Sequence, residues 1–430
     1  MVRTVSGKAR KKFLFQHPRG MHDILPKEQI WWEKIAKATK DVADSYNFLK
    51  IDTPTLEKAD IFERTVGVET DIVSKEMYFI KSSSDRLVMR PENTAGIVRA
   101  YLEYGLSHMG QPLKLYYFGS FFRREQPQAG RLREFHQAGF EILGGNSDPI
   151  YDAQTILALY RLIEAAKIKT PSIQVNSVGC RVCRPHFRKK LVDYYRKYEK
   201  DLCSDCKRRL KTNPLRLLDC KNQSCVALKA GAPSLMDNLC VTCNNHFKSV
   251  LEYLDELSLV YVLNNYLVRG FDYYNRTVFE IFADGYEHAI ASGGRYDYLA
   301  EMLGGRTTPG VGGAVGVERV LEVMRMRNIE LALPLKSKVF FVYIGDLSKK
   351  KTLSVMEEFR RAGMHVQESF GKDSLKKQMQ LADKGNARFA LIMGQKEVYE
   401  ESIIIRDLKS GVQESVPIKN AVEEVKKRMR

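Results

Sequence analysis

Four closely spaced pairs of cysteines form the most distinctive chemical pattern in this sequence. Every cysteine of the chain belongs to one of them: Cys180, Cys183, Cys203, Cys206, Cys220, Cys225, Cys240 and Cys243. A reducing compartment disfavours disulfides, whereas two thiolates separated by two to four residues can both reach one tetrahedral ion. The spacing predicts two structural Zn²⁺ sites with four thiolates each. It leaves open how the pairs combine, whether only one site is occupied, and whether the cysteines bind metal at all.

The segment that carries these cysteines is also strongly basic. Residues 171–254 contain sixteen Lys and Arg against seven Asp and Glu, within a chain whose net charge is +17. An excess of this size usually serves a polyanion, because binding phosphates releases their counterions. The basic runs 188–190 and 207–209 lie in helical patterns, the first of them close to Tyr194. We therefore expect this segment to contact nucleic acid, although a solvated helical face is the alternative.

Arginines beside apolar strands form a second group of candidate functional residues. Arg123 follows the apolar run 113–122, Arg269 precedes Gly270, and Arg319 follows the glycine-rich segment 310–313. An arginine in such a place is costly unless it meets an anion, and a guanidinium can bind two phosphate oxygens at once. The chain has no G-x-x-x-x-G-K-[ST] motif, so a phosphate site would be built from these arginines. Each of them could equally form a structural ion pair.

The hydrophobic pattern divides the chain into regions of different architecture. After an expected linker at 333–337, strands and helices alternate, which predicts a small three-layer α/β domain. Its expected elements are strands at 338–345, 365–369, 389–393 and 402–406 and helices at 348–361 and 374–384. Residues 20–170 and 255–326 mix strands such as 113–122 and 277–283 with a helix at 150–166 capped by Asp148, which suggests an antiparallel α+β core.

Targeting and membrane signals are missing from the sequence pattern. The first nineteen residues are basic and contain no apolar stretch of the kind that a secretory signal needs. The longest apolar runs stop far short of the roughly 18 residues that span a bilayer. These features predict a cytoplasmic chain with no membrane segment.

Five motifs resemble those of histidyl-tRNA synthetases, which are class II aminoacyl-tRNA synthetases. They are R-P-E-N-T at 90–94, F-R-R-E at 122–125 (motif 2), L-V-R-G-F-D-Y-Y at 267–274, S-G-G-R-Y-D at 292–297 and G-V-E-R at 316–319 (motif 3). Pro54 fits the dimer-forming motif 1. The resemblance runs from about Gly20 to the C-terminus, and the R-G-F-D-Y-Y signature is highly specific.

The resemblance implies an α+β class II fold with an antiparallel-sheet catalytic core. The implied organisation is a basic tail (1–19), a first core segment with motifs 1 and 2 (20–170), an inserted small Cys-rich basic helical domain (171–254), a second core segment with the histidine signatures and motif 3 (255–330) and an anticodon-binding α/β domain (336–430). A homodimer is also implied. The inserted domain is expected to clamp the tRNA acceptor arm.

The activity implied by the resemblance is that of a histidine–tRNA ligase. Such an enzyme activates L-histidine with ATP to histidyl-adenylate, releases pyrophosphate, and transfers histidine to the 3' end of tRNA(His). The implied histidine contacts are Glu92, Thr94, Gln137, Glu141, Tyr273 and Tyr274, with Glu141 and Tyr274 receiving the imidazole. The implied ATP contacts are Arg123, Glu125 and Arg319, with Mg²⁺ bridging the outer phosphates. Arg123 and Arg269 are the implied catalytic residues, and Gln128, Arg131 and Arg133 would meet the tRNA.

Two departures and two alternatives accompany this interpretation. Asn93 stands where many relatives have Gly, Phe271 stands where Leu is common, and the family does not require cysteines, so zinc rests on spacing alone. One alternative is a regulatory subunit of ATP phosphoribosyltransferase, which shares the core but generally lacks the C-terminal domain and loses signature residues. The other is a nonenzymatic, zinc-stapled nucleic-acid-binding protein, which would leave the arginine-bearing strands without purpose.

Overall fold

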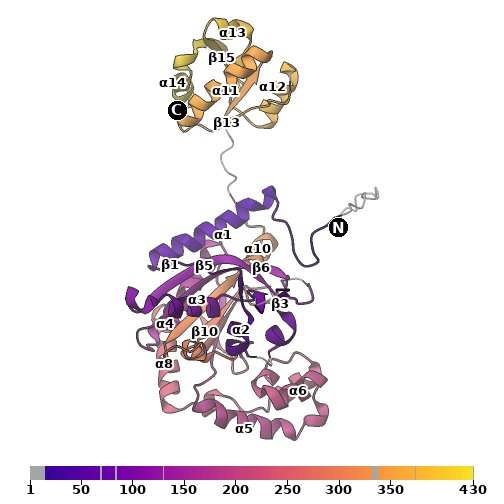
Figure 1. The fold of residues 1–430 in the computed structure, drawn as a ribbon, viewed down its shortest axis with the longest axis vertical. Coiled ribbons are helices and arrows are strands. Elements are labelled where there is room, and N and C mark those ends of the chain that lie inside the picture. The colour runs from indigo at the N-terminus through magenta and orange to yellow at the C-terminus, as the bar shows by residue number, and fades with distance from the viewer. Residues whose placement is uncertain are drawn as a thin grey trace. The chain divides into compact units, whose positions relative to one another are not determined.

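The computed structural model describes residues 15–67, 70–82, 85–128, 130–331, 338–372 and 374–429. The chain separates into two compact units, Met1–Glu330 and Leu331–Arg430 (Figure 1). Most of the expected basic tail and the expected linker 333–337 lie outside the described residues. Within the described ranges, no helix has both the length and the apolar character needed to cross a membrane.

The first unit is built on one sheet of eight strands. Their order is β1 (Leu49–Lys50), β5 (Leu113–Phe122), β6 (Glu134–Leu143), β11 (Gly310–Gly316), β10 (Ala291–Arg295), β9 (Asn275–Phe282), β7 (Ser172–Ser177) and β8 (Tyr261–Leu263). The pairings from β5 through to β7 are antiparallel, and β1 and β8 join in parallel at the edges. This confirms the expected antiparallel core and the strand at 113–122.

Alternation along the strands sends side chains to two covered faces of this sheet. Leu115 and Tyr117 of β5 join one apolar cluster with Ile97 of α3 (Thr94–Glu103), so α3 packs on that face. The other face is covered by α1 (Pro26–Ser45), α4 (Ile150–Ala165) and α10 (Val317–Met326) (Figure 1). The N-cap residue of α4 is Pro149 rather than the expected Asp148, although the Asp148 side chain accepts a hydrogen bond from Ile150 N at 3.0 Å. A separate three-stranded sheet has the order β2 (Leu56–Lys58), β4 (Leu87–Met89), β3 (Tyr78–Ile80).

A buried ion-pair network fastens α4 to strand β10. Arg295 is 1% exposed, and its Nε donates to Asp152 Oδ2 of α4 at 3.0 Å. Its Nη1 also donates to Asp297 Oδ1 at 3.0 Å. Buried charges persist only when they are paired and hydrogen-bonded, and here one guanidinium satisfies two carboxylates.

The Cys-rich segment leaves the sheet after β7 and returns before β8. Its main helices are α5 (Cys183–Arg196), α6 (Ser204–Thr212), α7 (Gln223–Lys229) and α8 (Val241–Glu256). We call residues 178–260 the inserted module. Its small core gathers Phe187, Leu191 and Tyr195 from α5 around Cys206 of α6. The first two share a helix face with Tyr195 because they recur at intervals of four residues. The expected helical character of this segment is confirmed.

The second unit is a five-stranded sheet with helices. The sheet order is β13 (Val366–Gln367), β12 (Val339–Tyr343), β14 (Phe389–Met393), β15 (Ser402–Asp407), β16 (Gln413–Pro417). Its helices are α11 (Asp346–Arg361), α12 (Leu375–Lys384), α13 (Gln395–Tyr399) and α14 (Ile418–Met429). The expected strands and helices are confirmed. Sequence reasoning missed β16, α13 and α14; β16 is an edge strand with four exposed residues out of five, which gives it no apolar pattern.

Candidate active site

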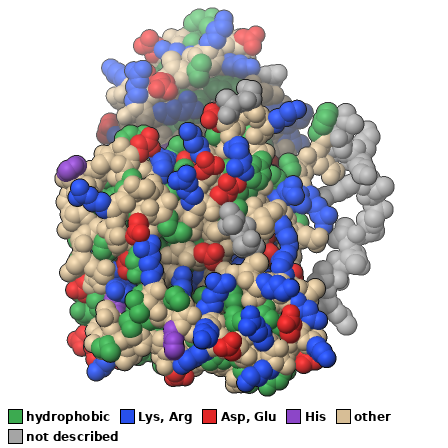
Figure 2. Space-filling view, turned by 60° about the horizontal axis from the view of Figure 1, so that its bottom comes forward, with side chains coloured by type: hydrophobic (Ala, Val, Ile, Leu, Met, Phe, Trp, Pro, Cys, Tyr) green, Lys and Arg blue, Asp and Glu red, His purple; other side chains and the backbone are tan. Residues whose placement is uncertain are grey.

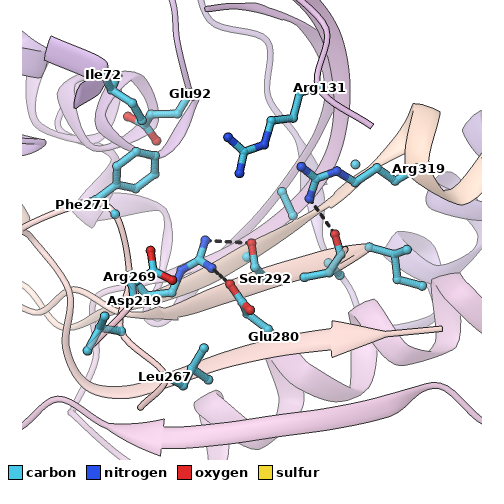
Figure 3. Close-up of a pocket in the computed structure, with 18 of the residues that line it drawn as sticks. Ile72, Glu92, Arg131, Asp219, Leu267, Arg269, Phe271, Glu280, Ser292 and Arg319 are labelled. Carbon is cyan, nitrogen blue, oxygen red and sulfur yellow. Dashed lines mark hydrogen bonds and ion pairs between the residues drawn. The ribbon is translucent and has the colours of Figure 1, made fainter. Parts of the chain in front are cut away.

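One cavity of about 540 Å³ brings most of the predicted site residues together (Figure 3). Its lining includes Glu92, Thr94, Arg123, Glu125, Arg131, Gln137, Arg269, Tyr273, Tyr274 and Arg319. These residues come from the start of α3, the end of β5, strand β6, the segment before β9, and α10. The antiparallel sheet is therefore what assembles motifs that lie far apart in sequence. Of the remaining predicted residues, Glu141 lies beneath the cavity, and Gln128 and Arg133 lie in the adjoining loop.

The start of α3 presents a carboxylate to the cavity. Glu92 accepts hydrogen bonds from the backbone N–H groups of Thr94 at 2.7 Å and Ala95 at 2.9 Å. These N–H groups belong to the first turn of the helix, where no helix carbonyl is available to accept from them. Burial raises the pKa of Glu92 above its usual value, although these two hydrogen bonds act in the opposite direction. The helix N-terminus thus fixes an acidic group where a cationic ligand would be stabilised.

Glu141 is a fully buried acid that lies behind the cavity lining and is connected to the cavity by its hydrogen-bond partners. Its Oε1 accepts a hydrogen bond from Thr94 Oγ1 at 2.8 Å, and its Oε2 accepts one from the Tyr296 hydroxyl. Burial raises the pKa of Glu141 to about 8. Strand β11 leaves room for it because residue 312 is glycine: a Cβ there would lie 1.6 Å from Glu141 Oε2. Tyr296 was not assigned from the sequence, although it stands in the S-G-G-R-Y-D motif.

Aromatic rings form one wall of the cavity. The ring centroids of Tyr273 and Tyr274 lie 4.6 Å apart, and Phe271 stacks on Tyr274 at 6.1 Å. The Tyr273 hydroxyl donates to Glu92 Oε2 at 3.5 Å. Burial raises the pKa of both tyrosines, so their hydroxyls stay protonated and can donate hydrogen bonds.

Arginine side chains surround the other end of the cavity. The Arg123 guanidinium lies 5.0 Å from the Phe135 ring centroid and 5.7 Å from that of Phe271, and its Nε donates to Pro91 O at 3.0 Å. Arg319 donates from Nε to Gly130 O at 2.9 Å and from Nη1 to Ala289 O at 2.7 Å. The rings and carbonyls hold both groups in place without neutralising them, which suits them to an anionic ligand.

Arg131 extends from the loop between β5 and β6 into the cavity (Figure 3). It forms an ion pair with Glu125 at 3.3 Å. Gln128 closes this loop by exchanging backbone hydrogen bonds with Arg131 at 3.1 and 2.9 Å. Arg133 supports the base of the loop by donating from Nε to Glu125 O at 3.1 Å.

Arg269 has protein partners on two neighbouring strands. Its guanidinium pairs with Glu280 of β9 and donates to Ser292 Oγ of β10 at 2.8 Å (Figure 3). Glu280 and Ser292 are direct cross-strand neighbours, which places them side by side beneath Arg269. Sequence reasoning missed Glu280; its position in the strand two residues before Phe282 carries no signal of this role. The structural ion pair that the sequence left open is therefore present.

Glu318 is another cavity residue without a predicted role. Its carboxylate accepts from His136 N at 2.9 Å and lies 2.8 Å from His136 Nδ1. The Trp32 ring of α1 packs against His136 with ring centroids 4.6 Å apart. The sequence signal that could have identified Glu318 is its place in motif 3. The contacts of Glu318 join α10 to the start of β6.

The cysteines form two tetrads. The first is Cys180, Cys183, Cys240 and Cys243, and the second is Cys203, Cys206, Cys220 and Cys225; within each tetrad the sulfurs lie within 4.8 Å of one another. We call the first the neck tetrad, because it stands where the inserted module leaves the sheet and returns to it, and the second the distal tetrad. The Sγ–Sγ distances of 3.8 Å for Cys180–Cys183 and 3.9 Å for Cys203–Cys220 match the edge of about 3.8 Å expected for a tetrahedron with Zn–S bonds of about 2.3 Å. The structure thus selects one pairing among those that spacing left open.

The fold and the cavity together define a class II aminoacyl-tRNA synthetase, in which arginines on an antiparallel sheet face a pocket containing buried acids. A family model described as histidyl-tRNA synthetase matches residues 20–184 and 207–320, and an anticodon-binding-domain model matches residues 338–428. The chain belongs to the histidyl-tRNA synthetase family.

Individual relatives agree with this assignment over nearly the whole chain. The histidine–tRNA ligase of Desulforamulus reducens is 40% identical and aligns with 96% of this chain and 100% of its own length. That of Dehalococcoides mccartyi is 41% identical, with 97% and 100% covered. Among solved structures, apo histidyl-tRNA synthetase from S. aureus is 30% identical with a TM-score of 0.79, covering 96% of this chain and 99% of that one.

Proposed function

We propose that this chain is a histidine–tRNA ligase that forms histidyl-adenylate from L-histidine and ATP and then transfers histidine to the 3' end of tRNA(His). The observation that supports it best is the division of one cavity into an acidic, aromatic end and an arginine-rich end. An amino acid with a cationic α-amino group and a hydrogen-bonding ring suits the first end. A triphosphate suits the second.

The acidic end accounts for histidine selection. Glu92, with Thr94 and Gln137, would hold the α-amino group. Tyr273, Tyr274 and the deeper Glu141 would serve the imidazole, with Thr94 and Tyr296 positioning the Glu141 carboxyl. A side chain that cannot form these hydrogen bonds would leave buried polar groups unpaired, which is strongly selective.

The arginine-rich end accounts for ATP binding. Arg123 would bind the α-phosphate and Arg319 the γ-phosphate, while Glu125 orients Arg131 beside them. Arg269 would stabilise charge as the histidine carboxylate attacks the α-phosphorus. Among the described residues no group of three carboxylates could hold a metal by itself, so Mg²⁺ is expected to arrive with the nucleotide and to be held largely by its phosphates.

The tRNA is assigned to the basic surfaces of the chain. The loop with Gln128, Arg131 and Arg133 adjoins the cavity and would meet the acceptor end. Figure 2 shows Lys and Arg side chains over the face of the molecule that includes the inserted module. Lys189 and Arg208 of this module are exposed. Phosphate contacts from such a surface position a nucleic acid without reading its sequence. The C-terminal unit would bind the anticodon, in keeping with the family model that it matches.

Three further properties belong to this proposal. Both tetrads would hold a Zn²⁺ ion. Its role would be structural, because four thiolates leave no open coordination position for catalysis.

A homodimer is supported by two exposed apolar side chains near Pro54. Leu49, on the edge strand of the large sheet, is 52% exposed, and Leu56 is 43% exposed. A cytoplasmic location fits eight free cysteines.

Histidine-dependent exchange of pyrophosphate into ATP, measured without tRNA, tests the proposed activation step. We expect exchange with histidine and background levels with each of the other nineteen amino acids. Charging of tRNA(His) with histidine would then test the transfer step. Absence of exchange from folded protein would overturn the proposal and favour a regulatory, non-aminoacylating role.

A further inference from the structure

The inserted module contacts the segment that carries Tyr273 and Tyr274 at two places. Asn213 donates from Nδ2 to the Asp272 carboxylate at 2.7 Å, and Arg184 contacts the backbone of the segment. Arg184 lies in the first turn of α5, immediately after Cys183 of the neck tetrad. Its Nη1 donates to Asp272 O at 3.2 Å and its Nη2 donates to Tyr274 O, while its Nε donates to Val178 O at 3.4 Å. The guanidinium therefore holds the two carbonyls that flank Tyr273.

This contact matters because the tyrosine segment lies outside the strands of the sheet. Strand β9 begins at Asn275, and the preceding residues form a turn. The described backbone contacts of this turn include Asp272 N, which donates to Val66 O at 3.1 Å. A buried carbonyl needs a donor, and Arg184 supplies one to each of two carbonyls in this turn. Its position thus bears directly on where the two tyrosine rings stand in the cavity.

The neck tetrad fixes the place from which Arg184 reaches. Cys180 and Cys183 stand where the chain leaves the sheet, and Cys240 and Cys243 stand where it returns through α8. Gly179 has a φ of +65°, and a Cβ there would lie 2.8 Å from Cys183 Cβ, so only glycine allows this tight approach. Cys240 N donates to Cys183 Sγ at 3.1 Å, and Arg184 N donates to Cys180 O at 3.1 Å. Closing the tetrad therefore orients the first turn of α5.

We propose that Arg184 is a positioning residue for the amino-acid pocket and that metal at the neck tetrad holds it in place. The proposal rests on the function given above, because it assigns Arg184 to the binding of histidine. Arg184 itself lies outside the cavity lining and acts through the backbone of Asp272 and Tyr274. The neck metal would thereby couple the inserted module to substrate binding, while the distal tetrad stabilises the module.

Pyrophosphate exchange with Arg184→Ala tests the positioning role. Loss of charged hydrogen bonds to two carbonyls is expected to raise the KM for histidine about tenfold or more and to leave the KM for ATP unchanged. Arg196→Ala is the matched control, since Arg196 is exposed in the last turn of the same helix. An unchanged KM for histidine, or equal changes for histidine and ATP, would overturn the proposal. If the wild type exchanges with no amino acid, the proposed function itself fails.

A double-variant comparison tests the link to the metal. Cys240→Ser is expected to reduce zinc from two ions to one per chain and to raise the KM for histidine by a factor similar to Arg184→Ala. Because both changes release the same turn, the double variant should be no worse than either single variant. Multiplicative effects would show that the two act separately, against the proposal.

Folding of the variants is checked by calorimetry, and Arg184→Lys provides a milder change that keeps the charge. Arg184→Lys should raise the KM for histidine less than Arg184→Ala does.

Amide hydrogen exchange in residues 270–276 gives an independent measurement if Arg184→Ala does not fold. It should be faster in Cys240→Ser than in the wild type, and unchanged exchange would contradict the proposal.

Discussion

The catalytic body and the inserted module are held together in different ways. The body uses an eight-stranded sheet whose faces are covered by helices, with aromatic and aliphatic side chains such as Phe121 and Val278 fully buried. The module has a small core in which Cys206, Cys220 and Cys225 take places that apolar residues fill elsewhere. A small core buries too little apolar area to offset conformational entropy, so metal coordination is expected to supply what is missing. The comparison teaches that apolar burial stabilises the body around the cavity, whereas the proposed metal sites would have to stabilise the module.

The largest expected effect is loss of the distal tetrad by Cys206→Ser. Cys206 is completely buried, and structural zinc contributes on the order of 10 kcal/mol in small zinc domains. We expect the region around α6 and α7 to become sensitive to protease while the body keeps its own unfolding transition. Limited proteolysis with mass spectrometry, beside calorimetry, measures this. Lys211→Ala, an exposed change in α6, is the control. Proteolysis at the wild-type rate would mean that the module is held by its apolar core.

The matching change in the body is Arg295→Ala. It leaves the buried carboxylates of Asp152 and Asp297 without the Arg295 guanidinium, so that Asp297 keeps the more distant Arg276 at 3.9 Å as an ion-pair partner. Breaking a buried ion pair in this way typically costs about 3–5 kcal/mol. Urea denaturation should show a lower free energy of unfolding by this amount, with zinc content unchanged. A loss below about 1 kcal/mol would show that the network is not a main contact between α4 and the sheet.

Glu141→Gln tests how much the buried acid Glu141 contributes to the pH dependence of stability. The pKa of Glu141 in the folded protein is about 8, above its ordinary value of 4.5, so the folded state holds this proton more tightly than the unfolded chain. Its contribution to stability is complete below pH 4.5 and is lost as pH rises towards 8. The amide stays neutral, so the stability of the variant should fall less than that of the wild type between pH 5 and 8, by up to a few kcal/mol. Denaturation at several pH values measures this difference, and parallel pH profiles would contradict it.

Arg123→Ala should change the rate of activation and leave stability nearly unchanged. Arg123 stands at the rim of a preformed cavity, where it stacks on Phe135 and Phe271. Removing one positioned charge donor typically costs a factor of about 100 or more in rate. Pyrophosphate exchange should fall by that factor, with the melting temperature within about 2 °C of the wild type. A large drop in melting temperature would assign Arg123 to the structure of the body instead.

The sequence was sufficient to predict those parts of the site that depend on a local pattern of residues. The place of Arg123 could be predicted because an apolar strand ends directly before it, and the helix of α4 could be predicted from its periodicity. The partners of Arg269 could not, because Glu280 and Ser292 meet only through the register of two antiparallel strands. The pairing of the cysteines was hidden for the same reason, since it depends on how helices fold back at the neck. Tertiary register, which no local pattern encodes, accounts for both gaps.

The parallel pairing of β7 with β8 has a consequence for how this chain can change over evolution. Two parallel neighbours cannot be joined by a tight turn and need a crossover of about a dozen residues or more, and the inserted module serves as that crossover. The sheet constrains only the two points where the chain departs and returns. Any segment that connects them satisfies the sheet, so the module can gain cysteines, change length or diverge in sequence while the cavity is preserved. If Arg184 positions the tyrosine turn as proposed, such freedom would end at this position near the departure point.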